Sequence, residues 1–315
     1  MMAECFVGID TSNYTTSVAL CSREGEVLAN LKRLLPVGEG ECGLRQSDAV
    51  FAHVRNLPIL MQELRPFLEG KRILAVGYSA RPRQAEDSYM PCFLAGKSAA
   101  YAVAKSLGVP LFELSHQNGH VMAAAYSGGV REKLLSKPFL AFHVSGGTTE
   151  ALLVTPDGVD FKCEIIGGTK DINAGQAIDR VGVAMGLNFP CGAELERLAL
   201  GFDAKLTKPK ICVEDGYCNL SGLENKALEL YKQTDNKNLV AAYVLDFVGA
   251  TLESITRDIK KKYGSYPVVY SGGVMSCSIL QKRLKKENAY FAEPRFSADN
   301  AAGIALLCRR KYLAQ

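Results

Sequence analysis

Hydrophobic and polar positions in the first third of the chain follow first the period of strands and then that of helices. The stretch CFVGIDTSNYTTSVALCS (residues 5–22) holds two apolar runs around a polar turn, which predicts two strands. The stretch 26–35 predicts a third strand. Apolar residues at helical spacing over 47–68 predict a helix, with Ser47 or Asp48 as its N-cap. A β-meander and a helix therefore open the chain.

Two further strands and two helices complete this half. ILAVGYSA (73–80) predicts a short buried strand, and the small residues of 92–109 predict a helix that Gly108 ends. The segment PLFELSH (110–116) predicts a strand that leads into another helix.

The pattern then restarts. Residues 138–168 again predict three strands joined by two turns, and the first turn is glycine-rich. The later predicted elements are helices at 173–187, 194–200 and 238–264, a strand at 267–274 and a helix at 300–314. Both halves open with a meander and a polar turn, which indicates an α/β protein built from two duplicated lobes.

The predicted lobes are residues 1–130 and 131–315, joined by a Gly-, Lys- and Ser-rich linker at 127–138. A basic, loop-like stretch near 201–226 predicts a small insertion with two short strands. We expect the last helix to return toward the cleft between the lobes.

Composition narrows the class of protein. The chain has 315 residues, of which 48% are hydrophobic and 22% charged, and its net charge of +4 permits a nucleic-acid partner without requiring one. No run of about 18 apolar residues and no signal peptide is recognised, so we expect a cytoplasmic protein with no membrane contact. The ten cysteines include no C-x-x-C pair, which favours reduced thiols over a disulfide or thiolate–zinc framework.

Three turns are rich in small hydrogen-bond donors: residues 10–17, 145–150 and 271–278. Such turns present backbone N–H groups with little obstruction, which is how a chain holds phosphate. Each alone also fits an ordinary hairpin. Two of them lie at equivalent points of the duplicated lobes, so together they predict nucleotide binding in the interlobe cleft.

Half of the chain's four histidines lie in the stretch SHQNGHVMAAAY, at His116 and His120. On a helix this spacing puts both side chains on one face, where they can hold one metal ion. A surface or capping pair is the alternative. Asp299, before the last predicted helix, is a candidate third ligand, and an N-cap role fits it equally well on local sequence.

Six ordered segments carry a family resemblance: GIDTSNYTTSVAL, SHQNGHVMAA, FHVSGGTTEALLV, DINAGQAIDRVGVAMGLNFPCGAELERLA, VVYSGGVMSCSIL and FSADNAAGIA. The chain resembles the family that makes threonylcarbamoyladenosine on tRNA, whose members were formerly described as glycoprotease-type (O-sialoglycoprotein) endopeptidases. The protease interpretation lacks a His-Glu-x-x-His motif, since position 117 is Gln. The resemblance implies two actin-like, RNase H-like lobes of the ASKHA superfamily around a nucleotide cleft.

The resemblance also implies site residues. The family's metal ligands fall on His116, His120 and Asp299, which favours the metal interpretation of the histidine pair. The nucleotide-binding residues that it implies are Thr11, Ser12, Val144, Ser145, Gly146, Gly147, Thr148, Asp179, Gly192, Glu196, Gly272, Gly273 and Cys277.

The implied chemistry is acyl transfer. The N6 amine of an adenosine in tRNA attacks threonylcarbamoyl-AMP and AMP leaves, with iron or zinc as Lewis acid. The implied cofactors are that divalent metal and an ATP-derived adenylate or ATP/ADP, with magnesium a further option. The implied partners are tRNA and either companion subunits of the pathway or a second copy of the chain.

Several positions depart from the family. The usual Glu-Thr-Ser-Cys-Asp-Glu/Asp-Thr is Asp-Thr-Ser-Asn-Tyr-Thr-Thr here, Thr148 replaces a histidine, Gln176 replaces a carboxylate and Cys277 an asparagine. A Pro-Gly-rich stretch is replaced by SARPRQAEDSYM. Two alternatives therefore stay open: a divergent paralogue that transfers a carbamoyl or acyl group to another acceptor, and a non-catalytic nucleotide-binding partner subunit.

Overall fold

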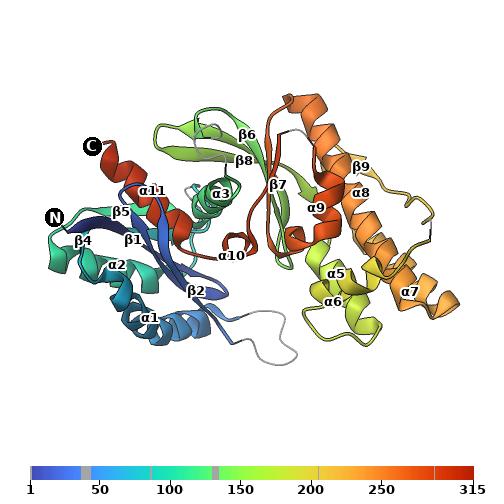
Figure 1. The fold of residues 1–315 in the computed structure, drawn as a ribbon, viewed down its shortest axis with the longest axis horizontal. Coiled ribbons are helices and arrows are strands. Elements are labelled where there is room, and N and C mark those ends of the chain that lie inside the picture. Colours follow the sequence, from blue (N-terminus) through green and yellow to red (C-terminus); the bar gives the residue numbers. More distant parts are fainter. Residues whose placement is uncertain (1, 37–43, 86, 130–134, 205, 287) are drawn as a thin grey trace. The chain divides into compact units, whose positions relative to one another are not determined.

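The computed structural model describes residues 2–36, 44–85, 87–129, 135–204, 206–286 and 288–315, which form two compact units (Figure 1). Unit 1 consists of Met1–Gly129, Pro156–Cys163 and Asp299–Gln315, and unit 2 of Val130–Thr155 and Glu164–Ala298. The predicted lobes were contiguous in sequence. The units differ from them because one hairpin turn and the last helix pack with the N-terminal residues.

Unit 1 is built on a five-stranded sheet with the order β3-β2-β1-β4-β5. β1 to β3 form the predicted antiparallel meander, and β4 and β5 continue the sheet parallel to β1. The strands are β1 (Ala3–Ser12), β2 (Thr15–Ser22), β3 (Val27–Leu34), β4 (Lys71–Arg81) and β5 (Leu111–Ser115).

Helices cover both faces of this sheet. They are α1 (Gln46–Leu68), α2 (Phe93–Leu107), α3 (His116–Ser127) and α11 (Ala302–Leu313). Successive residues of a strand face opposite sides of a sheet. A Cβ on Gly8 of β1 would meet Ala305 of α11, whereas Gly96 of α2 lies against Ile9. The even-numbered side chains of β1 therefore face α11, and the odd-numbered ones face α2 and the apolar core beneath α1.

Unit 2 contains most of a seven-stranded sheet with the order β12-β11-β6-β7-β8-β10-β9; the ends of β7 and β8 at their shared turn, within Pro156–Cys163, belong to unit 1. Its strands are β6 (Phe139–Val144), β7 (Thr149–Asp157), β8 (Asp160–Thr169), β9 (Val213–Glu214), β10 (Tyr217–Cys218), β11 (Val268–Ser271) and β12 (Ala289–Phe291). β6 is antiparallel to β7 and parallel to β11, and β11 is parallel to β12. The series β8-β7-β6-β11-β12 thus repeats β3-β2-β1-β4-β5, which confirms the duplication.

The helical elements of unit 2 are α5 (Ala174–Ala184), α6 (Gly192–Leu200), α7 (Ser221–Thr234), α8 (Lys237–Tyr263), the 3₁₀ turn η1 (Gly273–Ser276), α9 (Ser278–Leu284) and α10 (Pro294–Ser297). By length and composition α8 is apolar enough to cross a membrane, but 61% of its most apolar window is buried in the structure. It supplies many side chains of the unit 2 core, as a central helix of a folded domain does.

Two local predictions were wrong in part: the extent of the loop-like stretch at 201–226 and the start of the first helix. The insertion near 201–226 does hold two short strands, β9 and β10, but its end is helical because α7 begins at Ser221. The Asp171 carboxylate accepts the first N–H groups there, from Leu220 (2.7 Å) and Ser221 (2.9 Å), and a cap so distant in sequence gives no local signal.

The first helix begins earlier than predicted, and its N-cap is Arg45 rather than Ser47 or Asp48. The Arg45 carbonyl accepts the N–H groups of Asp48 and Ala49, each at 3.0 Å. Gly108 ends α2 in the left-handed region as predicted, with φ of 65°. All nine cysteines among the described residues are free thiols, as expected. The predicted linker at 127–138 lies partly outside the described residues.

Candidate metal centre and nucleotide turns

Helix α3 sets the geometry of the histidine pair. It begins at His116 because the Ser115 hydroxyl accepts the Asn118 N–H at 3.1 Å, which is an N-cap. His116 and His120 then project from the same face, with ring centroids 4.3 Å apart. Their Nε2 atoms are 2.9 Å apart and converge on one point.

Asp299 joins the pair from the segment before α11. Its Oδ1 lies 3.1 Å from His120 Nε2 and 3.7 Å from His116 Nε2. The competing N-cap role falls elsewhere: the N-cap of α11 is Ala301, and Asn300 Oδ1 accepts the Ala302 N–H. One ligand atom from each of the three predicted metal residues therefore lies within 4.8 Å of the others.

A close helix crossing brings Asp299 to the histidines. A Cβ on Gly303 of α11 would overlap the Gly119 carbonyl of α3, and a Cβ on Gly119 would meet the Ile304 side chain. Only glycine at these two positions allows the backbones to approach so closely. The glycine inside His116–His120 thus fixes the distance between α3 and the segment that holds Asp299.

Strand β1 orients two of the three candidate ligands. Asp10 is fully buried, and its Oδ1 accepts the Nδ1–H of His116 at 3.0 Å. Two residues on, and on the same face, the Ser12 hydroxyl donates to Asp299 Oδ2 at 3.2 Å. The Asp10 contact leaves the lone pair of His116 on Nε2, toward His120 and Asp299.

The same contact also raises the pKa of His116, so a metal that binds Nε2 would displace a proton from it. Burial lowers the pKa of His116. The charge of Asp10, its hydrogen bond and the charge of Asp299 together raise this pKa by more than burial lowers it, to about 9. Asp10 was not among the predicted site residues. The sequence feature that points to it is a carboxylate at the end of an otherwise apolar strand, where an unpaired charge is costly.

The donor set fits a divalent transition metal. Two neutral imidazole nitrogens and one carboxylate oxygen are ligands of zinc and of iron(II), whereas magnesium prefers oxygen ligands throughout. Three protein ligands leave coordination positions for a substrate. Asp10 supplies the carboxylate behind a ligating histidine that such sites commonly have.

The predicted phosphate-binding segment, Val144–Thr148, is the turn after β6 in unit 2. The turn is closed by Ser145 N–H to Thr148 O (2.7 Å) and by Thr148 N–H to Ser145 Oγ (3.1 Å). Gly146 and Gly147 are exposed, and a Cβ on either would meet no atom within 4 Å. The turn thus leaves backbone atoms accessible, as a phosphate site needs.

Two other glycines pack against this turn. A Cβ on Gly175, at the start of α5, would meet Gly146, and a Cβ on Gly272 would overlap the Val144 carbonyl. Gly272 also has φ of 97°, a conformation that favours glycine. The structure therefore brings the predicted turns around 145 and 272 together within unit 2.

The remaining predicted residues of unit 2 form linked pairs. Asp179 Oδ1 accepts the Cys191 N–H at 2.8 Å, beside Gly192, and burial raises the pKa of Asp179 although this bond lowers it. Glu196 Oε1 accepts the Ser278 N–H at 2.7 Å and its hydroxyl at 2.6 Å, beside Cys277. Gly273 opens η1 and is exposed.

Thr11 and Ser12 lie in unit 1 and have local partners there. The fully buried Thr11 hydroxyl donates to the Cys92 carbonyl (3.0 Å) and accepts the Gly96 N–H (3.1 Å), which ties β1 to the start of α2. Ser12 contacts Asp299, as described above. A nucleotide contact for either residue stays a prediction.

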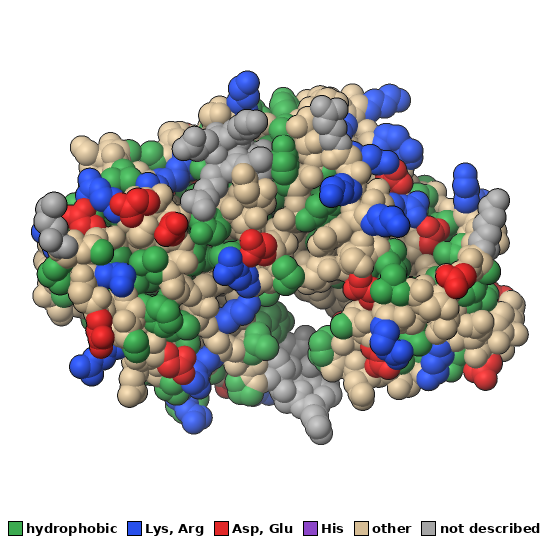
Figure 2. Space-filling view, viewed as in Figure 1, with side chains coloured by type: hydrophobic (Ala, Val, Ile, Leu, Met, Phe, Trp, Pro, Cys, Tyr) green, Lys and Arg blue, Asp and Glu red, His purple; other side chains and the backbone are tan. Residues whose placement is uncertain are grey.

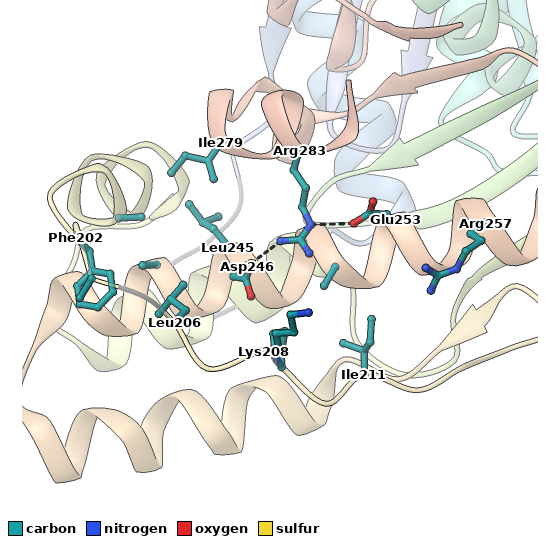
Figure 3. Close-up of a pocket in the computed structure, with 15 residues that line it drawn as sticks. Phe202, Leu206, Lys208, Ile211, Leu245, Asp246, Glu253, Arg257, Ile279 and Arg283 are labelled. Atoms are coloured by element: carbon teal, nitrogen blue, oxygen red, sulfur yellow. Dashed lines mark hydrogen bonds and ion pairs between the residues drawn. The ribbon is translucent and has the colours of Figure 1, made fainter. Parts of the chain in front are cut away.

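Unit 2 also contains a cavity of about 650 Å³ between α6, α8, α9 and the segment around 202–211 (Figure 3). In its wall Arg283 pairs with Asp246 and, at 3.4 Å, with Glu253. None of the residues that line the cavity is a predicted site residue. The cavity is therefore not the predicted nucleotide site.

Fold and site together define a class of protein. The duplicated sheets are those of the actin-like ATPase fold, and component A of (R)-2-hydroxyglutaryl-CoA dehydratase from Acidaminococcus fermentans shares this fold. Its solved structure aligns with a TM-score of 0.56 at 13% identity, over 98% of this chain and 99% of that one. Unit 1 adds a His-His-Asp cluster to the fold.

The family follows from sequence comparison. The family model described as "TsaD: tRNA N6-adenosine threonylcarbamoyltransferase" matches residues 89–306, and this chain belongs to that family. A Thermus thermophilus protein with the same descriptive name is 31% identical, over 99% of this chain and 93% of its own length. One from Streptococcus thermophilus is 29% identical, over 99% of this chain and 95% of its length.

Proposed function

We propose that this chain is a tRNA N6-adenosine threonylcarbamoyltransferase, which moves the threonylcarbamoyl group of threonylcarbamoyl-AMP to N6 of an adenosine in tRNA. The observation that carries the proposal is the convergence of His116, His120 and Asp299 in a chain of this family. In the reaction the N6 amine forms a C–N bond to the carbamoyl carbon. The bond from that carbon to the AMP phosphate oxygen breaks, N6 loses a proton and AMP leaves.

The metal-site residues have distinct parts in this proposal. His116 and His120 would hold a divalent metal, iron or zinc, with their Nε2 atoms and Asp299 would hold it with Oδ1; a metal held there would supply Lewis-acid chemistry toward substrate oxygens. Asp10 holds His116 in the tautomer that ligation requires, and Ser12 orients Asp299.

In this proposal the nucleotide-binding site lies in unit 2. The AMP moiety binds at the turns formed by residues 144–148 and 272–273, with Asp179, Gly192, Glu196 and Cys277 on the ribose and adenine side. Exposed glycines in these turns and their packing against each other support this assignment. ATP or ADP, with magnesium, is the alternative ligand of the same turns.

The tRNA presents its adenosine in a single-stranded loop, where the base edge is accessible without opening a duplex. We place the protein in the cytoplasm, acting with companion subunits of the same pathway or as a homodimer. The mildly basic net charge of +4 is compatible with an RNA partner.

The test combines metal content with AMP release from threonylcarbamoyl-AMP, with and without unmodified tRNA. Wild-type protein should contain close to stoichiometric metal and release AMP only when tRNA is present. Asp299→Asn, which keeps the shape of the side chain, should lose most of both because it removes the anionic ligand. Asp203→Asn, an exposed carboxylate of unit 2, is the matched control and should keep both.

Two results would point away from this function. Metal and nucleotide binding with AMP release that tRNA does not stimulate would indicate a different acceptor. Binding of both without any turnover would indicate a nucleotide-binding partner subunit. The changed residues of the first turn, Asn13 and Tyr14, are the feature that favours these alternatives.

A further inference from the structure

A second, smaller cavity of about 220 Å³ lies in unit 1, at the carboxyl ends of β4 and β5. The carboxyl ends of parallel strands are the usual place for a ligand in α/β folds. Its walls come from the end of β4, from the segment Ser88–Met90, from the start of α2 and from Glu113 of β5. None of these residues is a candidate metal ligand or a predicted nucleotide residue.

The cavity has an excess of positive charge. Arg81 and Lys97 both lie beside one carboxylate, Glu113, at 3.6 and 3.7 Å. That carboxylate also accepts the hydroxyl of Tyr78. Among the lining residues two cations thus share one anion, so one positive charge is left for a ligand. On the molecular face that Figure 2 shows, cationic and anionic side chains are interspersed, so attraction of an anion to that face depends on such local groups.

An exposed aromatic ring completes the cavity. Tyr89 lines it with 64% of its surface exposed, and Leu94 beside it is 49% exposed. A large ring held open to solvent next to two cations is the combination with which proteins bind single-stranded nucleic acid: bases stack on the ring, and cations contact the backbone. The sequence had shown this segment, SARPRQAEDSYM, in place of a Pro-Gly-rich stretch.

One side chain connects this cavity to the metal-site histidines. Phe93 lines the cavity, and its ring centroid lies 6.0 Å from that of His116. In addition, β5 carries Glu113 three residues before His116, the first residue of α3. Phe93 is therefore a neighbour of both the cavity and the candidate metal ligand His116.

We infer that this cavity binds a nucleotide of the acceptor RNA next to the adenosine that is modified. The base stacks on Tyr89, and Arg81 and Lys97 contact its phosphate. The inference rests on the proposed function, since it assigns the acceptor side of the same reaction. It identifies the ligand as single-stranded RNA.

The experiment measures binding of an unmodified tRNA transcript by fluorescence anisotropy at several salt concentrations. Tyr89→Ala should raise Kd about tenfold, as loss of one base-stacking ring does. Lys97→Ala should raise Kd and reduce the slope of log K against log salt by about 1, the value for one phosphate contact. Metal content and binding of threonylcarbamoyl-AMP should stay as in the wild type.

Two matched variants serve as controls. Phe51→Ala removes a ring of α1 that is also 64% exposed, and Lys105→Ala removes an exposed lysine of α2; neither residue lines the cavity. Both should bind tRNA as the wild type does. If Tyr89→Ala and Lys97→Ala bind tRNA with wild-type Kd and salt slope, or if the controls lose as much affinity, the inference is wrong.

The binding assay separates this inference from the proposed function. A wild-type protein that binds tRNA without tRNA-dependent AMP release would refute the transferase but still decide, through the variants, whether the cavity binds RNA. A wild-type protein that does not bind tRNA at all would refute both.

Discussion

At the scale of single residues, Asp10 determines what His116 can do. The carboxylate is fully buried and holds Nδ1–H, so Nε2 is the nitrogen that faces His120 and Asp299. The local sequence showed the spacing of the histidines but not which nitrogen would face inward. That depends on a residue 106 positions away in the chain, which no local pattern reveals.

Asp10→Asn should therefore weaken metal binding by about 10- to 100-fold, the usual effect of losing the carboxylate behind a ligating histidine. The amide keeps the size of the side chain but neither its charge nor a fixed acceptor toward Nδ1. Competition with a chelator of known affinity measures the change. The exposed Asp157→Asn is the matched control, and a wild-type metal affinity for Asp10→Asn would contradict the orienting role.

At the scale of elements, the site depends on the crossing of α3 and α11. The sequence predicted both helices and placed the histidines on one face of α3. Local sequence left Asp299 undecided between an N-cap and a ligand, because both roles use the same oxygens, and only the family resemblance favoured the ligand. The structure places the N-cap at Ala301, so the carboxylate lies beside the histidines instead.

Gly303→Ala should separate these two helices. Its Cβ would overlap the Gly119 carbonyl, so we expect a loss of about 1–3 kcal/mol in the free energy of unfolding, as for overpacked cores, together with a lower metal content. Denaturant unfolding and metal analysis check both effects. Gly222→Ala in α7, whose Cβ would meet nothing within 4 Å, is the control. An unchanged stability and metal content in Gly303→Ala would show that the close crossing is dispensable.

At the scale of the whole molecule, the candidate metal ligands and the predicted nucleotide-binding residues fall mostly in different units. The three metal-site residues all belong to unit 1, and most predicted nucleotide residues belong to unit 2. Each unit has its own hydrophobic core. Two cores of this kind do not have to unfold in a single step.

Calorimetry should therefore show unfolding that departs from two-state behaviour. Removal of metal by a chelator should lower the transition of unit 1, because the metal binds only its folded form. ADP at about 100 times its Kd should stabilise unit 2 by about 2.7 kcal/mol. A single transition, with calorimetric and van't Hoff enthalpies equal and both ligands shifting it alike, would contradict this separation.

The choice of Asp299 as third ligand came from the family resemblance, whereas the sequence by itself determined most element types, the duplication and the histidine pair as a metal candidate. These follow from hydrophobic period, turn residues and motif spacing, which are properties of neighbouring positions. It misplaced the cap of α1 and missed helix α7, since an Arg45 carbonyl and the distant Asp171 accept the N–H groups at those helix starts. Only the tertiary structure decided that Asp10 and Ser12 orient the ligands, and that one hairpin turn and the last helix join unit 1. Those outcomes depend on which distant residues pack together, and packing is a property of the folded chain.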